Sequence, residues 1–137
     1  MEKKNLLDLI YRLKAGCIAS EMRIMKETGL SPAEYNGIAA VNPGETITGS
    51  VLSRKMALSP SRASRVIDKM VKNGYLVRRN NTDDRRKCTI SLAKRGINIK
   101  KKIDKLKTDC DKRIREQLSQ KEIETLTHGL EQIIEVI

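Results

Sequence analysis

The hydrophobic residues of this chain recur with helical spacing in several segments that are separated by short polar breaks. The first such segment is residues 6–28, in which most positions outside the apolar stripe are polar and which Gly29 follows directly. This pattern predicts an amphipathic helix that ends at Gly29. Its apolar positions share one stripe: Leu6, Ile10, Leu13, Cys17 and Ile24. We therefore expect this stripe, including Cys17, to be buried.

Two short helices are predicted next. Ser31 and Glu34 have the spacing of a capping box, with proline at the first helical position, and they open a helix to about residue 41. The sequence "NPGE" at 42–45 is typical of a turn. Thr48 is then placed to cap a third helix that runs to about residue 56.

The segment 59–74, "SPSRASRVIDKMVKNG", predicts a fourth helix with a defined start and end. Ser59 is placed as the N-cap, Pro60 as the first helical residue and Gly74 as the left-handed residue that ends the helix. One stripe is apolar: Ala63, Val66, Ile67, Met70 and Val71. Because only two residues separate this helix from the third, the pair predicts a helix-turn-helix.

A hairpin and two further helices complete the pattern. The segments 75–79 and 87–92 favour strands, with "NNTDDRR" as a polar turn between them. Alternation in the second strand predicts that Cys88, Ile90 and Leu92 are buried. A long charged helix follows to about residue 118, and a second capping box, Ser119 with Glu122, opens the last helix. The predicted fold class is mainly α with a small two- to three-stranded β wing.

Composition narrows the functional class. The 137 residues include no Phe, no Trp and three cysteines without a CxxC pair, so we expect an aliphatic core and no disulfide framework. Neither a membrane span nor a secretory signal is predicted, because charges interrupt the N-terminal apolar segment, and we expect a cytoplasmic protein. A metal site is not expected, since the single histidine, His128, has no clustered partners. No cofactor and no enzyme activity are predicted.

The net charge of +11 is unevenly distributed. Residues 45–96 hold 13 Lys and Arg against 4 Asp and Glu, a net of +9, whereas the segments on either side are nearly neutral. Such a block indicates a polyanionic partner, and the absence of Trp and Phe argues against a membrane surface. Nucleic acid is therefore the expected partner.

Three stretches carry a family resemblance. "LSPAEYNGIAAV" at 30–41, "ITGSVLSRKMALSPSRASRVIDKMVKNGYLVRR" at 47–79 and "DDRRKCTISLAKRG" at 83–96 resemble the MarR family of winged-helix transcription regulators. The resemblance spans the whole chain and departs from the family at Ala57, where Gly is common, and at Ala93, where Thr is usual. It implies a winged helix-turn-helix lobe at 31–96, flanked by dimerisation helices at 1–28 and 97–137, within one domain at 1–137.

The helix at 59–74 has the properties expected of a recognition helix. In a helix-turn-helix the second helix enters the major groove, where Arg can bind guanine through two hydrogen bonds. The predicted DNA-binding residues on its polar face are Ser59, Ser61, Arg62, Ser64, Arg65 and Lys69. On the wing, the resemblance implies Arg86 in the minor groove, Asp84 as its orienting partner and Arg85 on phosphate.

The resemblance also implies a homodimer on a palindromic operator of double-stranded DNA, acting as a repressor. Family members often bind small phenolic molecules, for which Tyr11 and Tyr35 are candidate pocket residues here. Cysteine-based redox sensing through Cys17 is an alternative, which its expected burial and the lack of nearby aromatic residues disfavour. A winged-helix module for non-specific nucleic-acid binding or for protein interaction is a further alternative.

Overall fold

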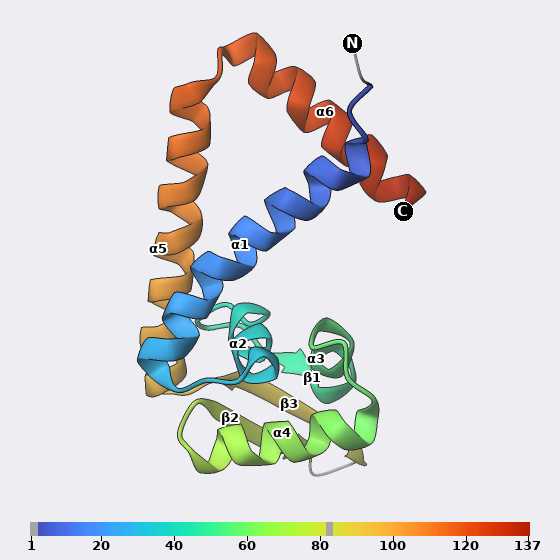
Figure 1. Cartoon of the computed structure of the whole chain (residues 1–137). Coiled ribbons are helices and arrows are strands. Elements are labelled where there is room, and N and C mark those ends of the chain that lie inside the picture. Colours follow the sequence, from blue (N-terminus) through green and yellow to red (C-terminus); the bar gives the residue numbers. More distant parts are fainter. Residues whose placement is uncertain (1–2, 82–83) are drawn as a thin grey trace. The chain divides into compact units, whose positions relative to one another are not determined.

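The computed structural model describes residues 3–81 and 84–137, and the side chains of residues 81–87 are outside that description. Within these ranges the chain forms six helices and one three-stranded sheet, in the order α1, α2, β1, α3, α4, β2, β3, α5, α6 (Figure 1). The prediction of a mainly α fold with a small β wing is confirmed. The chain divides into two compact units, Met1–Ile103 and Asp104–Ile137.

Side-chain caps set the start of the first two helices, and of these the sequence predicts the cap of α2. Helix α1, Leu6–Thr28, begins after Asn5, whose side chain accepts the Leu7 N–H, and ends at Gly29 with φ 76°. Helix α2, Pro32–Ala39, carries the complete capping box of Ser31 and Glu34. Both helices therefore begin where a polar side chain satisfies backbone N–H groups that have no partner within the helix.

The helix-turn-helix consists of α3, Gly49–Lys55, and α4, Pro60–Lys72. Their N-caps are Thr48 and Ser59, as predicted. The turn between them contains Ala57 with φ 56°, the left-handed region that L-residues other than glycine rarely adopt. Backbone hydrogen bonds from Ala57 N–H to the Arg54 carbonyl and from Leu58 N–H to the Ser53 carbonyl hold this turn closed.

The sheet is antiparallel, with β3, Asp84–Leu92, between β1, Ile47–Thr48, and β2, Leu76–Asn81. Register pairs Leu76 with Leu92 and Thr48 with Thr89. The predicted turn at 80–86 is wrong at its ends, because residues 80–81 and 84–86 belong to strands. Backbone pairing extends the hairpin through these polar positions, with an irregularity between residues 80 and 81.

The core of the first unit is aliphatic and draws on every layer of the winged helix. The largest fully buried side chains come from α2 and the segment after it, α3, α4, the sheet and α5: Ile38, Val41, Leu52, Met70, Leu76, Ile90 and Ile103. In β3, Ile90 and Leu92 are buried as predicted, whereas Cys88 is only half-buried. The predicted α4 stripe is also present, with Ala63, Ile67 and Met70 buried.

The expectation of a buried stripe along α1 is wrong within this chain. Only Ile24 of that stripe is buried, whereas Leu6 and Leu13 are 70% and 65% exposed and Cys17 is exposed too. The periodicity of α1 correctly indicates an apolar face. However, the rest of the first unit covers only the carboxyl end of that face.

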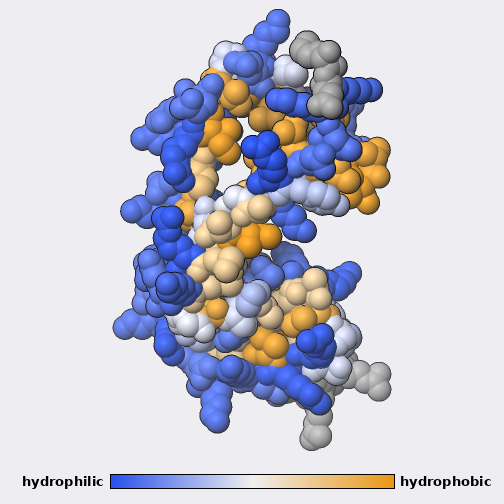
Figure 2. Space-filling model, in the orientation of Figure 1, coloured by the Kyte–Doolittle hydropathy of each residue, from blue (hydrophilic) through white to orange (hydrophobic). Residues whose placement is uncertain are grey.

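Helix α5, Lys94–Gln117, extends from the first unit into the second, and α6, Gln120–Val136, completes the chain. The predicted capping box opens α6: the Glu122 N–H donates to the Ser119 hydroxyl, and the Ser119 N–H donates to the Glu122 carboxylate. Hydrogen bonding to the carboxylate, first from the Ser119 backbone and then from its side chain, lowers the pKa of Glu122. No residue of α6 is buried, and Figure 2 shows hydrophobic side chains at its surface. None of the helices described is both long and apolar enough to cross a membrane.

Candidate DNA-binding interface

Helix α4 separates its apolar and basic side chains onto opposite faces. Because Ala63, Ile67 and Met70 anchor one face in the core, the opposite face is held toward solvent. All the predicted DNA-binding residues of this helix are exposed: Ser59, Ser61, Arg62, Ser64, Arg65 and Lys69. The structure thus brings three cations and three hydroxyls together on one accessible surface, which we call the α4 polar face.

The serines at the start of α4 differ in whether their hydroxyl groups already take part in hydrogen bonds within the chain. The Ser59 hydroxyl accepts the Arg62 N–H at 3.4 Å and lies 3.4 Å from the Ser61 hydroxyl, so its oxygen is already engaged as the N-cap. The Ser64 side chain makes no hydrogen bond within the described part of the chain. The helix start also presents backbone N–H groups, which favour anions such as phosphate.

An ion pair that the sequence does not predict fastens α4 to the wing. Asp68, on the exposed side of α4, pairs with Arg78 of β2 across ten positions of sequence. The Arg78 side chain is 28% exposed and that of Asp68 is 57% exposed. Both residues lie in segments that the sequence predicts as a helix and a strand. Periodicity, however, relates residues within one element and cannot indicate a contact between two elements. Their pairing depends on how α4 packs against β2.

The predicted wing residues are only partly described. The backbone of Asp84, Arg85 and Arg86 lies in β3, but their side chains lie outside the described part of the structure. The strands that carry the wing are firmly paired, with Val77 opposite Ser91. The roles assigned to these three side chains therefore stay predictions.

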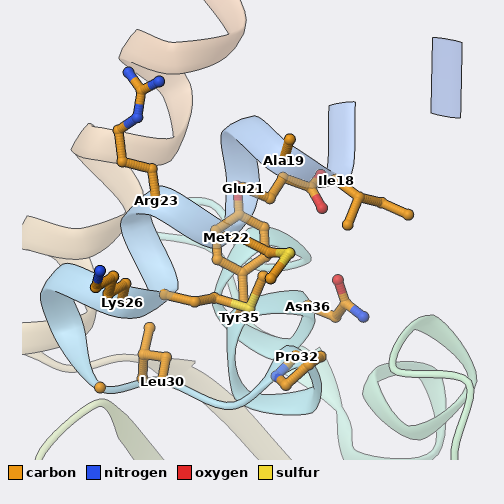
Figure 3. Close-up of a pocket in the computed structure, with 12 residues that line it drawn as sticks. Ile18, Ala19, Glu21, Met22, Arg23, Lys26, Leu30, Pro32, Tyr35 and Asn36 are labelled. Carbon is orange, nitrogen blue, oxygen red and sulfur yellow. The ribbon is translucent and has the colours of Figure 1, made fainter. Parts of the chain in front are cut away.

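A separate cavity of about 970 Å³ lies between α1 and α2 (Figure 3). Tyr35 lies at the centre of the residues that line it, with Met22 beside its ring, whereas the Arg23 side chain points away from that ring. Burial, and secondly the negative charge of Glu21, raise the pKa of the Tyr35 phenol to about 12. The phenol therefore keeps its proton at neutral pH and can donate a hydrogen bond.

The other candidate sensing residues lie elsewhere. Tyr11 is 58% exposed on α1 and does not line this cavity. Cys17 is also on α1 and exposed. The cavity also has polar lining residues, Glu21 and Asn36, which no pattern in the sequence singles out. Among the residues that the structure describes, no three His, Cys, Asp or Glu side chains form a group that could hold a metal ion.

Comparison with known proteins gives matches along most of the chain. Residues 28–87 match a family model described as the MarR family. The chain is 28% identical over 130 residues to the HTH-type transcriptional regulator SarZ of Staphylococcus haemolyticus (strain JCSC1435). The aligned region covers 92% of this chain and 84% of that protein.

Solved structures share the fold over nearly its full length. The MepR–DNA complex of S. aureus superimposes with a TM-score of 0.77 at 13% identity, covering 98% of this chain and 100% of that chain. NadR in complex with 4-hydroxyphenylacetate gives 0.74 at 14% identity, covering 97% and 94%, respectively. The reduced form of MarR from E. coli gives 0.73 at 19% identity, covering 97% and 98%. Residues 28–87, which contain the helix-turn-helix and most of the wing, thus match the MarR family in sequence, and the whole chain shares the winged-helix fold of these solved structures.

Proposed function

We propose that this chain is a sequence-specific regulator that binds duplex DNA as a homodimer, represses from a palindromic operator and is released by a small molecule. The observation that carries the proposal is the α4 polar face, where Arg62, Arg65 and Lys69 are all exposed opposite a buried anchor. Figure 2 shows hydrophilic side chains along the edge that α4 forms. The structural likeness to the MepR–DNA complex supports a DNA partner, and such a partner implies action in the cytoplasm.

In this mechanism, different residues provide the affinity for DNA and the selectivity for its sequence. The excess positive charge of residues 45–96 neutralises phosphates and attracts the duplex, while Arg62 and Arg65 reach base edges from the first two turns of α4. Two-fold symmetry would place the two half-sites about 10 base pairs apart. Arg86 on the wing is expected to enter a narrow minor groove and to read its shape.

Selection of bound sequences from random duplex DNA tests the proposal directly. Wild-type protein should recover a palindrome, and Arg65→Ala should relax one position of each half-site at a cost of about 1–3 kcal/mol. Arg65→Lys is the matched variant, because it keeps the charge but loses the planar fork that binds guanine. A phosphate contact would tolerate lysine, whereas a guanine contact would not.

Salt dependence tests the electrostatic part. With roughly 6–10 phosphate contacts, affinity should fall by about 10³–10⁵ between about 50 and 200 mM salt. Uniform, salt-sensitive binding without a selected palindrome would favour the alternative of a non-specific nucleic-acid module. A flat salt response would contradict DNA binding through the basic block.

The dimer is inferred from apolar surface that this chain leaves uncovered. On α1, Leu6 and Leu13 are more than 60% exposed, and on α6 Ile134 and Val136 are 75% and 82% exposed. Such large apolar side chains on amphipathic helices are typical of a buried interface. A second copy of the chain is the partner that the family likeness supports.

Release by a small molecule is inferred from the cavity between α1 and α2. Its lining is mostly apolar, and the Tyr35 phenol is available to donate a hydrogen bond, which suits a ligand with an apolar body and one acceptor group. A screen of small aromatic acids by thermal shift should find ligands that stabilise wild-type protein, and Tyr35→Phe should bind them more weakly. The DNA affinity of Tyr35→Phe without ligand should match that of wild type.

Cysteine-based sensing through Cys17, which is exposed in the single chain, is the alternative. The two release modes differ in their response to peroxide. If peroxide releases DNA from wild-type protein but not from Cys17→Ser, the redox mode holds. If neither protein responds, release by a ligand is the remaining mode to test.

A further inference from the structure

The carboxyl end of the recognition helix α4 is closed by a complete Schellman motif. Gly74, with φ 80°, donates its N–H to the Val71 carbonyl at 3.1 Å, and Tyr75 donates to the Met70 carbonyl at 2.9 Å. Asn73 donates to the Lys69 carbonyl. This network leaves the carbonyl of Asn73 itself pointing out of the helix end and in need of a donor.

Arg95, in the first turn of α5, supplies that donor. Its Nη1 lies 3.0 Å from the Asn73 carbonyl oxygen, and its guanidinium carbon lies 4.7 Å from the centre of the Tyr75 ring. A cation at a helix carboxyl end is favoured by the helix dipole, and the aromatic ring adds a cation–π contact. Arg95 thus binds the end of α4 through two independent interactions.

The backbone of α5 is joined to the same point. The Ala93 N–H donates to the Tyr75 carbonyl at 3.0 Å. At Gly96 the two segments of backbone approach so closely that a Cβ there would lie 2.2 Å from the Tyr75 carbonyl oxygen. The start of α5 is therefore held against the residue that follows the recognition helix, with no space for a larger side chain.

A second cation of α5 makes the same kind of contact with another helix. Lys100 is 3% exposed, and its Nζ donates to the carbonyl of Ala39, the last residue of α2, at 2.9 Å. Helix α2 in turn packs on α4, where a Cβ on Gly37 would lie 3.3 Å from the Met70 side chain. The first turns of α5 thus hold the carboxyl ends of both α2 and α4.

We propose that Arg95 is a positioning residue for base readout, and that with Lys100 it forms a clamp that fixes the angle of α4 against α2 and α5. The inference rests on the proposed function. The base-reading arginines lie toward the amino end of α4, so a small tilt about its carboxyl end displaces them from the base edges. The clamp would act on selectivity over the entire half-site, whereas each base-reading arginine acts at one position.

The test compares Arg95→Met with Lys101→Ala, which removes the same charge from an exposed position of the same helix. Affinity is measured for the selected palindrome and for random duplex of equal length at one salt concentration. Lys101→Ala should change both affinities by the same factor. Arg95→Met should lower the ratio of specific to random affinity by about three- to thirtyfold and broaden the selected half-site at several positions.

Arg95→Lys keeps the charge and one donor and should recover most of the ratio. If Arg95→Met melts below the assay temperature, Arg95→Gln replaces it, because that variant retains an N–H donor without the charge. Equal ratios of specific to random affinity for Arg95→Met and Lys101→Ala would overturn the clamp. Failure of wild-type protein to prefer any sequence would instead overturn the proposed function.

Discussion

Among the described residues, Ala57 is the one residue other than glycine that has a positive φ. Its φ of 56° places the Cβ close to the following carbonyl oxygen, a conformation that costs an L-residue about 1–2 kcal/mol. The turn between α3 and α4 keeps this geometry because two backbone hydrogen bonds and the flanking helices impose it. The departure from glycine noted in the sequence therefore corresponds to strain in the helix-turn-helix.

Ala57→Gly should stabilise the fold by about 0.5–1 kcal/mol, because relief of the strain exceeds the extra freedom of the unfolded chain. Urea unfolding measures the change. The matched control is Gly74→Ala at φ 80°, which introduces the same kind of strain and should destabilise. A loss of stability in Ala57→Gly would show that the left-handed turn does not strain alanine.

Tyr35 should make stability depend on pH in the alkaline range. Its phenol has a pKa of about 12 in the folded chain against 10.0 ordinarily, so the folded state binds this proton more tightly than the unfolded state. The contribution is present in full below pH 10 and is lost as pH rises to about 12. At about 1.4 kcal/mol per pKa unit, it amounts to at most about 3 kcal/mol.

The measurement is the free energy of unfolding of wild-type protein and Tyr35→Phe across this range. The stability of wild type should fall relative to that of Tyr35→Phe as pH rises from 10 to about 12, on top of any trend that both proteins share. Tyr11→Phe, at a position 58% exposed, is the matched control. A constant difference between wild type and Tyr35→Phe would contradict the assignment.

The start of α5 lies very close to the backbone of the segment that joins α4 to β2. The wing strand β3 ends at Leu92, and α5 begins two residues later against the Tyr75 backbone. The side chain of Leu92 also lies 3.2 Å from where a Gly96 Cβ would be. Packing of α5 against the winged helix therefore depends on the absence of a side chain at this position.

Gly96→Ala should destabilise the chain by about 2–4 kcal/mol, because the new Cβ would meet backbone rather than a movable side chain. Thermal or urea unfolding gives the value. Gly16→Ala in α1 is the control, since nothing lies within 4 Å of a Cβ there and alanine favours a helix by about 1 kcal/mol. Equal effects at both positions would contradict the close approach.

At the scale of the whole molecule, the unburied apolar side chains of α6 are the main feature. A helix with no buried residue gains little stability from its own chain, so its amphipathic pattern indicates a partner surface. The stripe contains Leu130 and Ile134, which are 43% and 75% exposed. The proposed partner is a second copy of the chain.

Leu130→Glu combined with Ile134→Glu should convert a dimer to a monomer without unfolding the first unit, because neither side chain is buried. Sedimentation at micromolar concentration measures the state, and loss of palindrome binding should accompany it. Gln132→Glu adds a charge at another exposed position of α6 and should remain dimeric. A monomeric wild-type protein would contradict the dimer at once.

The amino-acid sequence by itself determined the features that depend on neighbouring residues. The caps at Ser31, Thr48, Ser59 and Ser119 are all present, because a hydroxyl and the N–H groups that it accepts lie within three residues of each other. The division of α4 into buried and polar faces follows in the same way from helical periodicity. The family resemblance rests on these local patterns and on the wing.

Only the tertiary structure decided what each face and each charge contacts. Periodicity correctly indicated an apolar face on α1 but not that most of it is uncovered in this chain. The Asp68–Arg78, Arg95–Asn73 and Lys100–Ala39 contacts join residues 10, 22 and 61 positions apart. No local pattern specifies such pairs, because they form only when the core brings α2, α4, α5 and the sheet together. The residues that touch DNA could thus be proposed from sequence, whereas the contacts that orient them required the fold.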